Sequence, residues 1–151
     1  MNTKDHREKM TGALREVFLP DLRAKGFKGS LPHLRRIGLE RVDYLSIQHN
    51  SSGGSFVVEL ATVGPDGKPP GYGRNLSIEK LNVQYFSNRL RLGSDPARGQ
   101  VDHWYEFGPA SYAKDSRPYP EDHYREIAKR VLKDFETQGE EWLRGGGKGP
   151  N

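Results

Sequence analysis

Two strand-like segments separated by a five-residue turn are the feature that most constrains the fold of this 151-residue chain. Side chains of a β-strand point alternately to its two faces, so Leu45 and Ile47 share one face of the segment 42–49. The segment 55–63 shows the same alternation, and the residues between, Asn-Ser-Ser-Gly-Gly at 50–54, favour a turn. We therefore predict an antiparallel hairpin of these two strands.

Three weaker segments extend the predicted sheet. Leu31–Ile37 contains Pro32, which predicts an edge strand or one that begins after the proline. Asn82–Leu92 alternates, with Tyr85, Arg89 and Arg91 on its polar face, and Asp102–Phe107 predicts a short fifth strand. Glycine and proline fill residues 64–74, which predicts a loop.

Amphipathic segments at the two ends predict helices that cover this sheet. The first ends at Gly26, and the second runs from about Pro120 to Leu143 with an interruption at Gly139. The order helix, strands, helix predicts an α+β fold. We expect a two-layer sandwich whose antiparallel sheet of four or five strands is covered on one face by an N-terminal and a long C-terminal helix. Residues 1–144 form the single predicted domain, and the glycine-rich residues 145–151 a disordered tail.

Composition narrows the class of protein. The 24 basic and 20 acidic residues give a net charge of +4, too small by itself to indicate nucleic-acid binding. The chain contains no cysteine, which excludes disulfides and thiol chemistry. No apolar run is long enough to span a membrane, and the charged N-terminus with Asp5 and Glu8 does not resemble a secretory or transit sequence. We expect a cytoplasmic, bacterial protein without membrane contact.

Candidate catalytic residues lie in one short segment. Asp102 and Glu106 flank Trp104 and would share a face of an extended strand, with His103 nearby, a combination suited to acid–base chemistry. The alternative is a solvated strand end beside a buried Trp104. The histidines show no metal-ligand spacing, and the glycine-rich runs lack the strand and helix of a phosphate loop, so we predict no metal site and no cofactor.

A polar and aromatic sheet face is the candidate partner-binding surface. Strand alternation predicts that it presents Tyr44, Tyr85, Arg89 and Arg91 to solvent. Tyrosine and arginine are enriched at interface hot spots, and the basic stretch 23–41 adds positive charge. An acidic protein is the favoured partner. Nucleic acid is the less favoured one, because the aromatic motif of RNA-recognition sheets is absent.

The order of several short motifs resembles a known family. They are Leu14, Leu22 and Gly26-Phe27; Leu45-Ser46-Ile47-Gln48; Asn50 to Leu60; Arg89-Leu90; Trp104-Tyr105; and Gly139 with Trp142-Leu143. Together they resemble the bacterial domain of unknown function 4304 family over most of the chain. The resemblance implies the fold and assigns no activity or catalytic residue.

Two hypotheses about function follow. The first is a non-enzymatic protein-interaction module, of the kind that immunity proteins exemplify, which uses the exposed polar and aromatic sheet face. The second is a small enzyme or a nucleic-acid-binding or processing protein that uses Asp102, His103, Glu106 and the sheet arginines.

Overall fold

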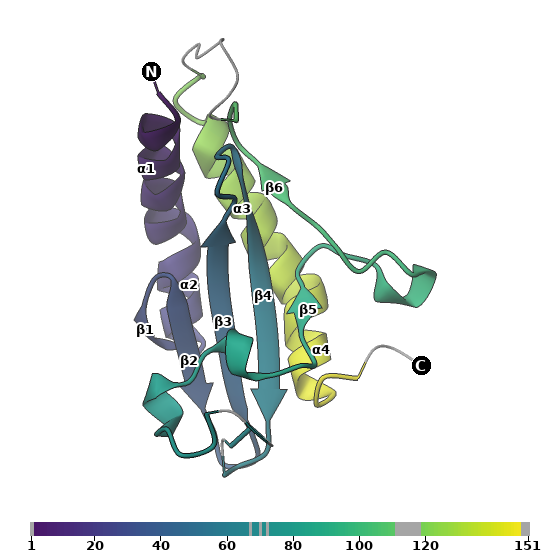
Figure 1. Cartoon of the computed structure of the whole chain (residues 1–151). Coiled ribbons are helices and arrows are strands. Elements are labelled where there is room, and N and C mark those ends of the chain that lie inside the picture. The colour runs from purple at the N-terminus through teal and green to yellow at the C-terminus, as the bar shows by residue number, and fades with distance from the viewer. Residues whose placement is uncertain (1, 67, 70, 72, 111–118, 149–151) are drawn as a thin grey trace.

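The computed structural model describes every residue except 1, 67, 70, 72, 111–118 and 149–151. Its helices are α1 (Thr3–Ala13), α2 (Leu19–Ala24), α3 (His123–Asp134) and α4 (Glu140–Arg144). Its strands are β1 (Lys28–Ser30), β2 (His33–Ile37), β3 (Val42–His49), β4 (Ser55–Val63), β5 (Leu90–Arg91) and β6 (Tyr105–Glu106). The predicted α+β fold is confirmed: an antiparallel sheet lies against two long helical segments (Figure 1).

The N-terminal helical segment is fixed at both ends by local hydrogen bonds. The Asn2 side chain accepts from the Asp5 amide at 2.8 Å while the Asp5 carboxylate accepts from the Asn2 amide at 3.0 Å, a capping box. A π-helical turn, Leu14–Phe18, joins α1 to α2. Gly26 adopts a φ of +98° after α2, and the Phe27 amide donates to the Leu22 carbonyl at 3.0 Å, so the glycine ends the helix as predicted.

The sheet follows the order β1-β2-β3-β4-β5, and β6 pairs with β4 beyond the end of β5. The predicted hairpin is confirmed, with β3 and β4 paired from Val42 opposite Val63 to His49 opposite Phe56. β2 begins directly after Pro32, as the proline indicated. None of the helices in the described part of the chain is long and apolar enough to cross a membrane.

The segment predicted as a fourth strand folds differently. Only Leu90–Arg91 pairs with β4, while Ile78–Lys80 and Val83–Tyr85 form 3₁₀ turns. The outer face of β3 and β4, the face away from the helices, carries a second apolar group, and the turns cover it with Leu81, Val83 and Phe86. The prediction of a strand over Asn82–Leu92 was therefore wrong, because burial of this second apolar group decided the local structure. Residues 67, 70 and 72 of the predicted loop lie outside the described residues.

The main core fills the space between the helices and the inner face of the sheet. Phe18 and Phe27 pack edge-on against Phe135 at ring-centroid distances of 6.1 and 5.8 Å. A π-helical turn, Phe135–Gly139, joins α3 to α4, so the C-terminal helix continues through Gly139. A β-carbon at Gly139 would lie 3.1 Å from a Leu60 methyl group, so the missing side chain lets the helix approach β4 closely.

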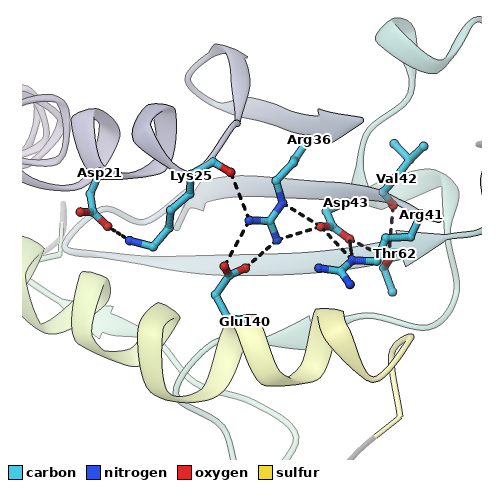
Figure 2. Close-up of polar contacts among 8 residues, drawn as sticks. All are labelled: Asp21, Lys25, Arg36, Arg41, Val42, Asp43, Thr62 and Glu140. Carbon is cyan, nitrogen blue, oxygen red and sulfur yellow. Dashed lines mark hydrogen bonds and ion pairs between the residues drawn. The ribbon is translucent and has the colours of Figure 1, made fainter. Parts of the chain in front are cut away.

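A charged network at the base of this core ties the sheet to α4 (Figure 2). Arg36 of β2 donates from Nε to the Asp43 carboxylate at 2.9 Å and from Nη2 to the Glu140 carboxylate at 2.6 Å. Asp43 also accepts from Arg41 Nε at 3.0 Å and from Thr62 Oγ1 at 2.8 Å. Only 2% of the Asp43 side chain is exposed, and these donors satisfy a carboxylate that burial would otherwise destabilise.

The glycine-rich segment after α4 is partly held in place. The Gly147 amide donates to the Trp142 carbonyl at 3.0 Å, and Asn88 Nδ2 donates to the Gly147 carbonyl at 3.1 Å. The expectation of disorder from residue 145 onward was therefore wrong for residues 145–147. The last part of the predicted tail, residues 149–151, lies outside the described residues.

Candidate functional site

The outer face of the sheet is divided into a covered half and an open half. The 3₁₀ turns cover the half near Tyr44, where Val42 and Ala61 are buried. Toward the β3–β4 turn, no helix of the described residues lies over this face (Figure 1). The open half is therefore where side chains can meet a ligand or partner.

A row of polar side chains crosses this open half. The strand register places His33 opposite Ser46, Ser46 opposite Glu59, and Glu59 opposite Arg91. Directly opposite residues share a face of the sheet, so the row runs over four strands from β2 to β5. Ser46 and Glu59 are 5% and 6% exposed, which makes them the floor of the site.

Glu59 is a buried carboxylate held by two arginines. Its oxygens lie 3.8 Å from Arg89 Nη1 and 3.7 Å from Arg91 Nε. Both distances fit ion pairs but are long for direct hydrogen bonds. Removing a carboxylate from water is costly unless opposite charge lies near it, and the two guanidinium groups supply that charge.

Arg91 is the most connected side chain of the site. Besides Glu59, it bonds to the Asp102 carboxylate, and its guanidinium carbon lies 5.4 Å from the centre of the Trp104 ring. The hydrogen bond from Arg91 lowers the pKa of Asp102 below its ordinary value. Trp104 Nε1 donates to the other Asp102 oxygen at 3.3 Å. Arg91 is thereby held in one orientation while 30% of its side chain stays exposed.

Two of the four residues predicted to bind a partner, Arg89 and Arg91, lie together on this surface. Tyr85 is half-buried in a 3₁₀ turn. The expected exposure of Tyr44 was wrong, because only 1% of it is exposed. Its hydroxyl donates to the Ile78 carbonyl at 2.9 Å, its ring stacks on Phe86, and burial raises its pKa to about 12. The turns that replace the predicted strand cover it.

The three candidate acid–base residues point to different surroundings. Asp102 contacts Arg91 and Trp104, whereas the His103 ring packs edge-on against Tyr105 at 4.7 Å. Glu106 is exposed in β6 opposite Ser55. Among the described residues, no side-chain contact brings these three residues together, and no group of three or more His, Asp or Glu residues is placed to hold a metal ion.

Much of the positive charge of the basic stretch 23–41 is used inside the molecule. Arg36 is bound by Asp43 and Glu140, and Lys25 pairs with Asp21. Arg23 donates to the Gly29 carbonyl. The stretch is therefore less available to an outside anion than its sequence indicates.

A comparison with models of known protein families shows which family the chain belongs to. The family model described as "Domain of unknown function (DUF4304)" matches residues 18–145. The chain belongs to this family. A search of the curated proteins and a search of the solved structures found no match.

For this DUF4304 member, sequence reasoning missed the floor of the site. His33 Nδ1 and Ser46 Oγ are hydrogen-bonded at 2.7 Å, and burial lowers the pKa of His33, which favours the neutral ring. This resembles a nucleophile and its base. Ser46, however, lies within a strand whose amides serve the ladder, and Glu59 neighbours Ser46 in the register. Among the described residues, no third group orients the histidine and no donors are placed for an oxyanion, so the arrangement of the pair is that of a structural hydrogen bond.

No sequence signal set Glu59 or Ser46 apart. A single polar residue on one face of a strand is ordinary for an exposed position. Only the register of β2 to β5 shows that these residues share a row with His33 and Arg91.

Proposed function

We propose that this protein is a non-enzymatic interaction module that binds another protein through the open half of the outer sheet face, centred on Arg91 and Trp104. The observation that carries the proposal is the arrangement of Arg91 between Glu59, Asp102 and the Trp104 ring. Arginine and tryptophan dominate binding energy at protein interfaces. Side chains that are already held in one orientation lose less conformational entropy on binding, which favours affinity.

The charges of this centre favour a protein over a polyanion. Glu59 and Asp102 offset the two arginines, so a nucleic-acid backbone would meet both signs of charge. Binding of single-stranded nucleic acid also uses exposed rings as stacking platforms, and the buried Tyr44 does not provide one. The enzyme hypothesis has less support, because Asp102, His103 and Glu106 are not directed to a common point.

Photo-crosslinking tests this function. A benzoyl-phenylalanine replaces Glu106, which shares the outer face with Ser55, and a control variant carries it at the exposed Lys129 on α3. We expect a discrete crosslinked protein from position 106 in native cells and none from position 129. The captured protein is then purified and titrated against Arg91→Ala and Trp104→Ala.

Each of these truncations should weaken binding by about 2 kcal/mol or more, roughly 30-fold, as for hot-spot residues. Lys129→Ala should bind like the wild type. Equal crosslinking at both positions, or wild-type affinity of Arg91→Ala and Trp104→Ala, would refute the proposed surface.

A further inference from the structure

β3 extends past the end of β2, and part of its edge has no neighbouring strand among the described residues. β2 pairs with β3 only as far as Ser46, whereas β3 continues to His49. The Ile47 amide donates to the Pro32 carbonyl at 2.9 Å. Pro32 has no amide hydrogen, so it cannot return a bond to the Ile47 carbonyl. The ladder of the β2–β3 hairpin therefore stops at this proline.

The backbone N–H and C=O groups of His49 point to the same side of β3 as those of Ile47, the side away from β4. Amide groups along a strand alternate in direction, so the His49 amide points the same way as that of Ile47, away from β4. The next amide, that of Asn50, donates to the Ser55 carbonyl on the β4 side, in agreement with this alternation. The Ile47 carbonyl and the His49 amide and carbonyl thus form a short strand edge open to a new partner.

Basic side chains of α1 and of the π-helical turn after it lie beside this edge. Lys4 and Arg7 lie three residues apart on α1, and Arg15 lies eight residues further on, in the π-helical turn that continues α1. This spacing places the three along one side of the helical segment, with Thr11 between them. Arg7, Thr11 and Arg15 line a cavity of about 450 Å³ together with Ile47, Gln48 and His49. Lys4 and Arg7 line an adjoining cavity of about 220 Å³ that also contacts His49. We call these two cavities together the α1–β3 groove.

The charge of the α1–β3 groove is positive. Lys4, Arg7 and Arg15 are exposed and form no ion pair with any described residue. Glu59 is the single carboxylate among the described residues that line the groove, and it is already paired with Arg89 and Arg91. A ligand in the groove therefore meets unpaired cations beside free strand-edge groups.

We propose that the α1–β3 groove binds an extended acidic segment of a partner protein as an added strand on β3. The segment's backbone would bond to Ile47 and His49, and its carboxylates would meet Lys4, Arg7 and Arg15. Strand addition beside a helix is a recurrent mode of peptide recognition, in which the backbone supplies affinity and side-chain contacts supply specificity. The proposal deepens the proposed function and rests on it, because it assigns a chemistry to part of the partner.

Other occupants fit the groove less well. The aromatic residues among the described residues that line the groove are two histidines and Phe107. The groove therefore offers few rings on which nucleobases could stack. A second copy of the chain would have to offer an acidic edge strand. The edge strands β1 and β5 of this chain instead carry Lys28 and Arg91, and the third edge strand, β6, offers the single carboxylate of Glu106 in only two residues.

The test is an NMR titration of the full chain with an acetylated and amidated hexapeptide of alternating glutamate and valine. In a strand, this alternation places all the carboxylates on one face. The control peptide has lysine in place of glutamate, and mixed-sequence single-stranded RNA is the third probe. The variant is Arg7→Ala with Arg15→Ala. Its matched control is Lys9→Ala with Arg98→Ala, which loses the same charge at exposed positions that do not line the groove.

We expect saturable binding of the glutamate peptide and about tenfold slower hydrogen exchange of the His49 amide. The groove variant should bind about 5- to 30-fold more weakly, since two rim charges contribute roughly 1–2 kcal/mol together. The matched control should bind like the wild type, and the lysine peptide should not bind.

Three results would overturn the proposal. They are no binding of the glutamate peptide below about 1 mM, binding that leaves the His49 amide unprotected, and tighter binding of RNA with a steep dependence on salt. If one of these occurs while crosslinking from position 106 persists, the groove is refuted and the Arg91–Trp104 surface stands. Loss of crosslinking with intact peptide binding would refute that surface instead.

Discussion

Substitution of Asp43 by alanine should destabilise the protein more than removal of any exposed charge. Asp43 lies on the inner face of β3, where its carboxylate accepts from Arg36, Arg41 and Thr62 at 2.9, 3.0 and 2.8 Å. Only 2% of its side chain is exposed, against 16% for Arg36. Without Asp43, Arg36 keeps Glu140 as its only carboxylate partner among the described residues.

The expected loss of unfolding free energy depends on the charged groups that the substitution leaves unpaired. Removal of one partner of a buried ion pair costs about 3–5 kcal/mol, because a buried charge remains without compensation. Glu140 still neutralises Arg36, and Arg41 is 31% exposed and can turn toward water. We therefore expect Asp43→Ala to lower the free energy of unfolding by about 3 kcal/mol, the lower end of that range.

Urea denaturation followed by circular dichroism measures this change. The control is Asp21→Ala, because Asp21 pairs with Lys25 at a site where the two side chains are 35% and 26% exposed. An ion pair of that exposure contributes about 0.5 kcal/mol. If Asp43→Ala costs no more than Asp21→Ala, the network in Figure 2 does not hold α4 on the sheet and the reasoning is wrong.

Two further predictions concern pH and the β3–β4 turn. Burial, and then the charge of Arg7, lower the pKa of His49 from 6.5 to about 4, so the unfolded chain binds more protons between these values. The free energy of unfolding should therefore fall as the pH drops from 7 to 5, by about 1–2 kcal/mol for this residue. His49→Leu should remove that part of the slope, and an unchanged slope in chemical denaturation would contradict the assignment. At Gly54, φ is +82° and a β-carbon would lie 2.6 Å from the Gly108 carbonyl oxygen, so Gly54→Ala should cost about 2 kcal/mol or more in thermal or urea unfolding. Gly99→Ala is the matched control, because its φ of +79° is similar but its β-carbon would meet open space. Equal losses for the two variants would show that the contact with Gly108 does not matter.

Local chemistry determined the elements that could be predicted from the sequence. The hairpin of β3 and β4 follows from strict alternation on both sides of a turn-forming sequence, and both signals act within a few residues. The end of α2 at Gly26 depends on the positive φ that glycine adopts without steric cost. The start of β2 after Pro32 depends on a missing amide hydrogen. Each of these signals lies in the same residues whose local structure it determines.

Tertiary packing decided the rest. Alternation placed Tyr44 on the face away from the helices, but it does not say whether another segment covers that face. The 3₁₀ turns near Val83 cover it, because burial of a second apolar group outweighs the strand period of residues 82–92. The row from His33 to Arg91 joins residues that are far apart in the chain, so only the register of four strands assembles it. The sequence by itself determined which way side chains point along each strand, whereas the site depends on which strands lie side by side and where each one ends.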